Sequence, residues 1–180
     1  VTNEEGWLIT PEVLPFGEGY SIVEVEAPYG YVLNSDPVFF NVTPENAVSE
    51  DGIVLVIAEK ENTPQKGTIT IEKTGEVFSS VEIQEGKLQD RYKPIYEESG
   101  LEGAEFEIRA AEDITTPDGT LRYSAGEVVD TLTTSADGTA TSTELYLGKY
   151  EIVETKAPYG MVLNEEPISV ELEYAGQEVA

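Results

Sequence analysis

The chain has 180 residues, of which 36 are acidic and 10 basic, and its formal net charge is -26. It contains no cysteine and no histidine, which excludes disulfides, thiolate or histidine nucleophiles and ordinary zinc sites. So negative a chain is disfavoured as a binder of nucleic acid or of an anionic membrane, because both are polyanions. The charge is typical of a well-hydrated surface protein, and it favours calcium association or a cationic partner. We expect no cofactor.

The first 64 residues contain strand and turn signals but no helical periodicity. Glu5-Gly6 is expected to be a turn that leads into a short strand, and Val38–Val42 alternates in the manner of another strand. Asp51-Gly52 is a further turn signal. The polar stretch 59–67 contains a proline and a glycine, as a junction between domains does.

Residues 65–180 also predict an all-β unit. Period-two alternation indicates strands over 68–73, 104–108, 128–132 and 168–172, with Asp-Gly turns at Asp118 and Asp137. Residues 76–100 are interpreted as an insertion, either a hairpin around Glu85-Gly86 or a mobile loop. The residues expected to contribute to a sandwich core are Ile69, Ile71, Phe106, Ile108, Tyr150, Ile152 and Val170.

An internal repeat indicates the architecture. Residues 20–37, YSIVEVEAPYGYVLNSDP, recur as residues 150–167, YEIVETKAPYGMVLNEEP, with 12 of 18 positions identical at a constant offset of 130. We therefore expect two tandem β-sandwich modules, 1–64 and 65–180. Because the two copies have unequal flanks, the first is expected to be N-terminally truncated and the second to lack its last strand. The modules are predicted to lie in line with little shared surface, since the junction is polar and short.

Three charged residues are expected at the end of apolar strand faces, because side chains at i, i+2 and i+4 share a face. These are Lys73 after Ile69 and Ile71, Glu154 after Tyr150 and Ile152, and Glu24 after Tyr20 and Ile22. Burying such a group costs on the order of several kcal/mol unless it is paired or neutralised. The pattern leaves two structural alternatives open. The charges reach solvent at the strand ends, or Lys73 and Glu154 form a plain ion pair.

An ordered series of motifs resembles a known domain. The series is GTITIEK at 67–73, LEGAEFEI at 101–108, Asp137-Gly138, and YEIVETKAPYG at 150–160. It is similar to the collagen-adhesin B-type, or SpaA-like, prealbumin-fold repeat domain of Gram-positive pilins and surface proteins. The resemblance covers nearly the whole chain. It implies prealbumin-like or Ig-like β-sandwiches and no enzymatic turnover.

The resemblance also implies a covalent crosslink. In that family a first-strand lysine condenses with an asparagine or aspartate on the last strand, assisted by a glutamate of the Ala-Pro motif. By this correspondence Lys73 is the nucleophile and Glu154 its acid, while Glu24 is the acid and Asn62 the acceptor of the first module. Asn62 and Lys73 belong to adjacent modules and are not expected to pair. Neither bond is expected to be complete within these 180 residues.

Two functions follow from this resemblance. The first is a structural spacer of an extracellular, cell-wall-anchored stalk, with neighbouring repeats of the same protein as partners and the anchor outside these residues. The alternative is an adhesive module that binds a host protein or glycan, with Tyr92 and Tyr96 in the 76–100 insertion as contact residues. No membrane insertion is expected, because the longest apolar run, Ile53–Ala58, is far too short.

Overall fold

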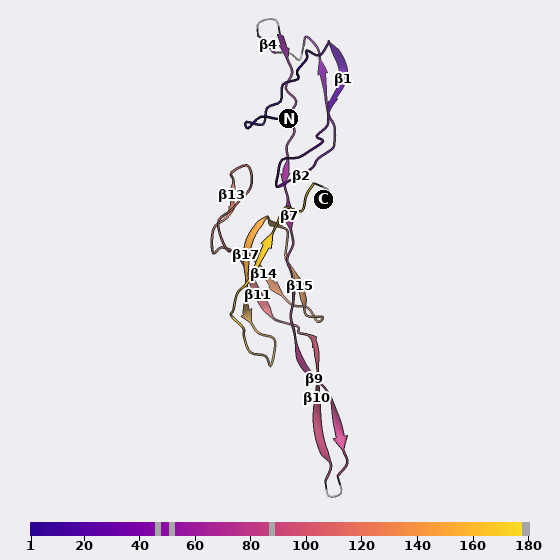
Figure 1. Cartoon of the computed structure of the whole chain (residues 1–180), viewed down its shortest axis with the longest axis vertical. Coiled ribbons are helices and arrows are strands. Elements are labelled where there is room, and N and C mark those ends of the chain that lie inside the picture. Colours follow the sequence, from indigo (N-terminus) through magenta and orange to yellow (C-terminus); the bar gives the residue numbers. More distant parts are fainter. Residues whose placement is uncertain (46–47, 51–52, 87–88, 178–180) are drawn as a thin grey trace. The chain divides into compact units, whose positions relative to one another are not determined.

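The computed structural model describes residues 1–45, 48–50, 53–86 and 89–177, and this part of the chain contains strands and turns but no helix (Figure 1). Contacts divide the chain into two compact units. Unit one comprises Val1–Thr63 with the C-terminal residues from Gln177, and unit two comprises Pro64–Gly176. The expected all-β fold is confirmed. That these units are complete or truncated modules, and that they lie in line, stays a prediction.

Unit one is built from short antiparallel pairs. Strand β1 (Gly17–Ile22) pairs with β3 (Val38–Val42), and β4 (Val48–Glu50) pairs with β5 (Ile53–Leu55). Strand β2 (Tyr31–Val32) pairs with β6 (Thr63–Pro64). Tyr20 lies opposite Phe40, and the two rings stack with centroids 5.6 Å apart. This aromatic pair joins the two longer strands of unit one.

Two expectations for unit one need correction. Residues 7–16 form no strand, because no other described segment pairs with them and a strand requires a hydrogen-bonded partner. The turn at Glu5-Gly6 does form, since Asn3 Oδ1 accepts hydrogen bonds from the backbone N–H groups of Glu5 and Trp7. Ile22 is 38% exposed, so the expected apolar face of β1 is only partly covered. The predicted turn at Asp51-Gly52 lies outside the described residues.

Unit two is a β-sandwich. One layer is a four-stranded antiparallel sheet in the order β14-β11-β17-β18, formed by Val128–Thr133, Glu105–Ala110, Gly148–Lys156 and Ile168–Leu172. Facing it are two small pairs, β8 (Thr70–Glu72) with β15 (Thr139–Thr141), and β7 (Lys66–Gly67) with β16 (Leu145–Tyr146). Strands β12 (Ile114–Thr115) and β13 (Leu121–Tyr123) form a separate hairpin.

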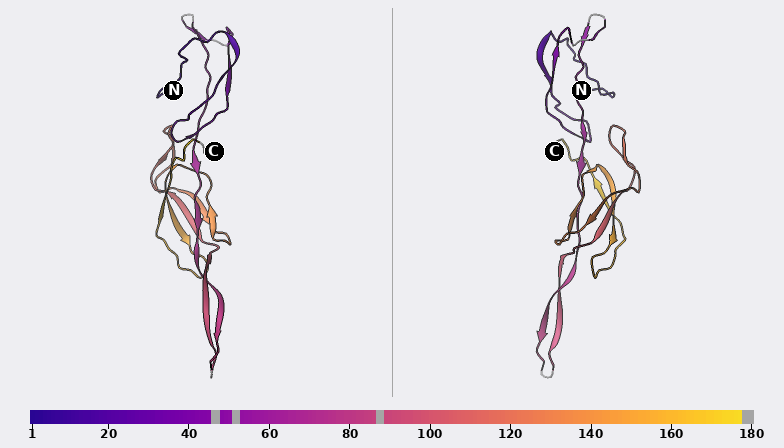
Figure 2. Two further views of the ribbon diagram at one scale, coloured as in Figure 1. Left: turned by 45° about the vertical axis from the view of Figure 1, so that its right-hand side comes forward. Right: turned by 180° about the vertical axis from the view of Figure 1, so that it is seen from behind.

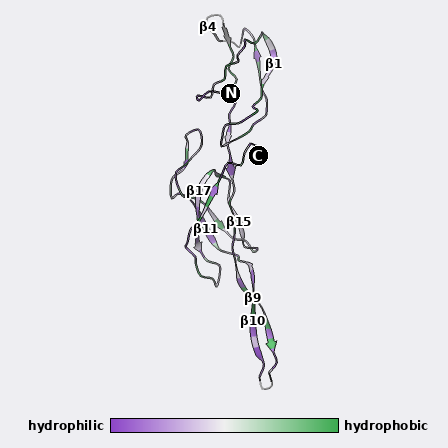
Figure 3. Cartoon of the chain, in the orientation of Figure 1, coloured by the Kyte–Doolittle hydropathy of each residue, from purple (hydrophilic) through white to green (hydrophobic). Residues whose placement is uncertain are grey.

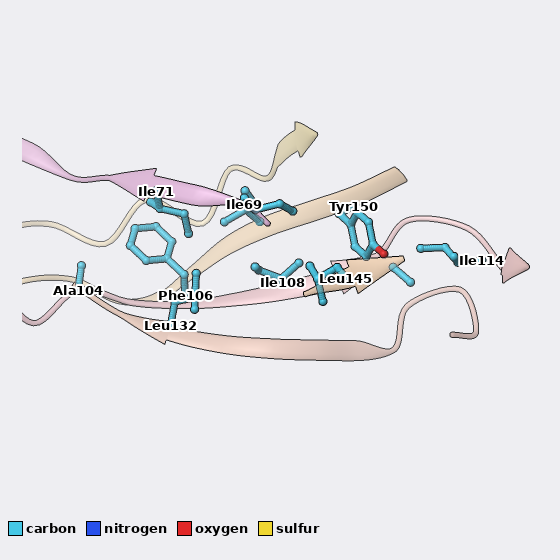
Figure 4. Close-up of a cluster of buried hydrophobic side chains, with 11 residues drawn as sticks. Ile69, Ile71, Ala104, Phe106, Ile108, Ile114, Leu132, Leu145 and Tyr150 are labelled. Atoms are coloured by element: carbon cyan, nitrogen blue, oxygen red, sulfur yellow. The ribbon is translucent and has the colours of Figure 1, made fainter. Parts of the chain in front are cut away.

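The core lies between these two layers (Figure 4). Ile69 and Ile71 pack from the small-sheet side against Phe106, Ile108 and other side chains of the four-stranded sheet. The predicted core is confirmed, with Val170 partly buried at its margin. The buried cluster consists of Ile69, Ile71, Ala104, Phe106, Ile108, Ala110, Ile114, Leu132, Leu145, Tyr150 and Ile152.

Residues 74–84 and 91–100 pair as a long hairpin, so of the two alternatives left open for the insertion the hairpin is observed. Strand β9 (Thr74–Gln84) pairs with β10 (Arg91–Gly100) in a two-stranded antiparallel sheet. The hairpin projects away from the sandwich of unit two, as the views agree (Figures 1 and 2).

Candidate crosslinking site

Unit two brings Lys73 and Glu154 together, 81 residues apart in the chain (154 − 73). Lys73 follows β8, and its Nζ lies 2.9 Å from Oε1 of Glu154 on β17. The Glu154 side chain is 3% exposed and that of Lys73 24%. Of the two alternatives, the ion pair is therefore the observed one, and its acid is almost excluded from water.

The turn at Asp137-Gly138 holds the backbone of Lys73. The Lys73 N–H donates to the carbonyl of Gly138 at 2.8 Å, and the Leu101 N–H donates to the Lys73 carbonyl at 2.8 Å. Gly138 has φ +84°, and a Cβ at this position would lie 2.4 Å from the Lys73 carbonyl oxygen. Only glycine allows both the left-handed backbone and this close approach. The sequence predicted the turn but not its contact with Lys73.

Asp137 stabilises this turn, in which the Gly138 N–H donates to the Ser135 carbonyl at 2.8 Å. Its Oδ1 accepts hydrogen bonds from the Ser135 hydroxyl at 2.6 Å and from the Thr139 N–H and hydroxyl at 2.9 and 2.7 Å. These donors favour the ionised carboxylate, with the Ser135 hydroxyl contributing most, and lower the pKa of Asp137 from 3.8 to about 2. The turn that holds Lys73 is thus itself held by a carboxylate that is ionised at neutral pH.

The second oxygen of Glu154 is also bound. Its Oε2 accepts the backbone N–H of Asn164 at 2.8 Å. The Asn164 side chain in turn accepts the N–H of Glu166 at 3.1 Å, which shapes the local loop. Asn164 belongs to the repeated motif but was not identified as a site residue from sequence. Its position ten residues after the glutamate in both copies was the available signal.

Unit one contains the matching half of such a site. Oε1 of Glu24 accepts a hydrogen bond from Nδ2 of Asn62 at 3.0 Å. Oε2 of Glu24 accepts the Asn34 N–H at 3.3 Å, as Glu154 does with Asn164. The Oδ1 atom of Asn62 is buried and has no hydrogen-bond partner among the described residues. Burying a carbonyl oxygen without a hydrogen bond costs free energy, and the Asn62 side chain bears this cost.

The repeat is therefore structural as well as sequential. The offset of 130 relates Glu24 to Glu154 and Asn34 to Asn164, and each pair makes the same backbone contact. The Ala-Pro-Tyr-Gly segments are turns in both units. The N–H of Tyr31 donates to the Pro28 carbonyl at 3.2 Å, and that of Met161 to the Pro158 carbonyl at 3.0 Å. Unit one presents a glutamate with an asparagine, whereas unit two presents a glutamate with a lysine.

Two further observations concern the described residues only. No three of their aspartate and glutamate side chains gather as a metal site requires. The described part of the chain also has no helix of the length and apolarity needed to cross a membrane.

Comparison with known proteins identifies the class. The family model for the SpaA prealbumin-like fold domain matches residues 1–53 and 91–180, so the chain belongs to this family. It is a family of structural and adhesin folds that occur in Gram-positive surface proteins. The unmatched residues 54–90 include all of β9.

The solved structures that match include one that is similar over almost the whole chain. This is the Bacillus anthracis TIE protein, which shares 26% sequence identity with a TM-score of 0.55. The alignment covers 98% of this chain and 26% of that one, so the present chain spans about a quarter of the length of its structural relative. No curated protein matches.

Proposed function

We propose that the chain is a spacer segment of a cell-wall-anchored surface stalk, in which each prealbumin-like unit is locked by an intramolecular isopeptide bond. The observation that carries the proposal is the contact of 2.9 Å between Lys73 Nζ and a Glu154 carboxylate that is 3% exposed. The family's crosslink requires this juxtaposition of nucleophile and acid. The Glu24–Asn62 contact supports it, because it supplies the acid and acceptor of the same reaction in unit one.

The chemistry follows from these groups. In the proposed reaction the Lys73 amine attacks the carbonyl carbon of an asparagine carboxamide. A C–N bond to Nζ forms, and the bond from the carbonyl carbon to the carboxamide nitrogen breaks. Glu154 is the group placed to take a proton from Nζ and to pass protons to the departing nitrogen. An ammonium, a carboxylate and a carboxamide thus become a substituted amide, a carboxylic acid and ammonia. Holding the partners in a rigid sandwich replaces the binding step of an enzyme.

A stalk function agrees with the composition and fold. A crosslink between the first and last strands of a sandwich closes the chain into a covalent loop, which resists pulling. The net charge of -26 keeps neighbouring modules hydrated and mutually repelling. The partners proposed for this chain are therefore further repeats of its own parent protein, on the outside of the cell.

The test supplies the acceptor in the register of the repeat. Residues 51–64 are appended after residue 180, which places the copy of Asn62 at position 192 (62 + 130). The intact mass of this fusion is expected to be lower than its sequence mass by one ammonia. Lys73→Arg and Glu154→Ala in the same fusion are expected to retain the full mass.

Two controls isolate the reaction. The fusion with alanine in place of the appended asparagine is expected to lose nothing, and the 180-residue chain itself is expected to show its full sequence mass. Circular dichroism of each variant shows that the sandwich is folded. A folded fusion that keeps its full mass contradicts the crosslink and leaves Lys73–Glu154 as a plain ion pair.

A further inference from the structure

The hairpin β9–β10 contains a bulge that rearranges its faces. Phe78 lies opposite Tyr96, but the next pair joins Ser80 to Ile95, so Ser79 is an extra residue in β9. Directly opposite residues of an antiparallel pair point to the same face. Simple alternation would separate Phe78 from Val81, and the bulge returns both to one face.

As a result one face of the hairpin is continuously apolar from Phe78 to Ile83 and across to Tyr92–Tyr96. The Phe78 and Tyr96 rings are in edge contact, with centroids 6.3 Å apart, which agrees with their shared face. Figure 3 colours the distal end of β9 as hydrophobic. Tyr92 is 68% exposed and Phe78 59%, so nothing in the described chain covers them. We define the apolar face as Phe78, Val81, Ile83, Tyr92, Pro94 and Tyr96.

The distal part of the opposite face is polar, because it pairs Glu82 with Lys93 and Gln84 with Arg91. Nearer the base, this face also carries Ile95 and Val77. A hairpin that served only as a spacer would gain nothing from segregating its side chains, since neither face packs on the sandwich core. A contiguous exposed apolar surface of this kind marks an interaction site.

An acidic pair adjoins the apolar face at its base. Glu76 and Glu98 lie directly opposite each other, on the face that carries Phe78 and Tyr96. Glu98 Oε1 accepts the Thr74 hydroxyl at 2.9 Å, which holds this carboxylate over the face. Like charges directly opposite on a sheet are destabilising. A cation set between the two carboxylates would remove this repulsion.

The edges of the ribbon are poorly suited to strand addition. Pro94 removes an N–H from the β10 edge, and the bulge at Ser79 interrupts β9. Both devices are typical of edges protected against pairing. Recognition is therefore expected through the apolar face and not through backbone hydrogen bonds along an edge.

We propose that the apolar face docks an extended segment of another protein whose apolar side chains adjoin a lysine or arginine. The apolar side chains lie on the rings of Phe78 and Tyr92, and the cation lies between Glu76 and Glu98. A second copy of this chain fits less well, because each copy carries a net charge of -26 and the same acidic pair. This docking role does not depend on the isopeptide crosslink.

The experiment uses the full chain and two synthetic peptides. In the first, valine, phenylalanine, valine and lysine alternate with threonines, so that all four share one strand face; in the second, glutamate replaces the lysine. Labelled peptides are titrated with the chain and followed by fluorescence anisotropy. The lysine peptide is expected to bind about tenfold more tightly than the glutamate peptide, since only its charge complements the carboxylates.

Matched variants locate the binding. Tyr92→Ser, on the apolar face, is expected to lower the affinity for the lysine peptide about tenfold. Ile95→Ser, on the opposite face, is expected to change this affinity by less than about twofold. Glu76→Gln combined with Glu98→Gln is expected to bring the two peptides to nearly equal affinity. Circular dichroism is run on each variant, and Phe78→Ser serves in place of Tyr92→Ser if that variant is misfolded.

Several results overturn the proposal. They are failure of the lysine peptide to bind, equal binding of the two peptides by the unmodified chain, and equal loss in the Tyr92 and Ile95 variants. Two others assign the face to a different occupant. One is binding to phosphatidylcholine or phosphatidylglycerol vesicles in place of peptide, and the other is self-association in sedimentation that Tyr92→Ser removes.

Discussion

The Glu154 carboxylate is buried and makes two protein contacts, with the Lys73 ammonium at 2.9 Å and with the Asn164 N–H at 2.8 Å. A charge held in this way is stable only while both contacts persist, because the surrounding core cannot solvate it. Exposed pairs on the same sandwich lack this dependence. Lys156 and Glu105, for example, lie 2.5 Å apart with exposed fractions of 64% and 44%.

This contrast gives a prediction for Lys73. Lys73→Met leaves the Glu154 carboxylate buried beside an apolar group, and the free energy of unfolding should fall by about 3 kcal/mol. Lys156→Met, at the exposed pair, should cost less than about 1 kcal/mol. Urea denaturation of both variants measures the difference. Equal losses at the two sites would show that burial of Glu154 adds nothing to the pair.

A second prediction concerns Gly138. Gly138→Ala forces a Cβ to within 2.4 Å of the Lys73 carbonyl, whereas Gly119, with φ +81°, has no atom within 4 Å of a built Cβ. Gly119→Ala should therefore lower the free energy of unfolding only by the cost of a left-handed backbone, about 1–2 kcal/mol. Gly138→Ala should lower it clearly more, because it adds the steric clash. Thermal unfolding compares the two. In the fusion carrying an acceptor, Gly138→Ala should also slow the loss of ammonia, because it displaces Lys73.

At the scale of elements, Lys73 follows strand β8 and Glu154 lies on β17, but a turn sets the geometry of this pair. The turn between β14 and β15 contacts Lys73 through one backbone hydrogen bond and contacts Gly100 so closely that a Cβ there would meet the Asp137 carbonyl. The hairpin β9–β10 begins and ends beside this turn, at Thr74 and Gly100. The Lys73–Glu154 pair and the base of the hairpin are thus built on one turn.

The ionised state of Asp137 makes the turn sensitive to acid. Its pKa in the folded protein is about 2, below the ordinary 3.8, so its stabilising effect is present above pH 3.8 and is lost as the pH falls through about 2. Asp137→Ala should be less stable than the unmodified chain near neutral pH, with the gap closing between pH 4 and 2. Chemical denaturation across this range tests it. A gap that is constant with pH would mean that the carboxylate charge is not involved.

For the whole molecule, the dominant physical fact is charge. Acidic residues exceed basic ones by 26 (36 − 10), and few of them are paired in the described structure. Such self-repulsion opposes the compact state while keeping separate molecules apart. Such a charge is consistent with the Gram-positive surface proteins in which this family occurs.

Salt should therefore stabilise the chain. Raising NaCl from about 0.01 M to about 0.5 M shortens the screening length well below the spacing of surface charges, and the melting temperature should rise by several degrees. Sodium sulfate is avoided, because it also strengthens apolar burial. The loss of unfolding free energy caused by Lys73→Met should change little with salt, since a buried pair is screened less than exposed ones. A melting temperature that falls with NaCl would contradict dominance by repulsion.

Much of the site could be predicted from the sequence. Period-two spacing placed Ile69, Ile71 and Lys73 on one face, and the repeat identified Glu24 and Glu154 as equivalent positions, because both signals are local or periodic. The expectation of a strand after Glu5-Gly6 was wrong, because local signals do not show whether a partner strand exists. Its residues have strand-like character, but a strand also needs a partner, and none of the described segments supplies one.

The sequence by itself thus determined the all-β class, the family and the core of unit two, and it suggested Lys73, Glu154, Glu24 and Asn62 as site residues. Only the tertiary structure decided that Lys73 pairs with Glu154, that Gly138 holds the lysine backbone, and that a bulge at Ser79 unites the apolar face of the hairpin. The physical reason is that alternation along a strand is encoded in neighbouring residues. Pairing register and backbone contacts between distant segments arise only when the strands have come together.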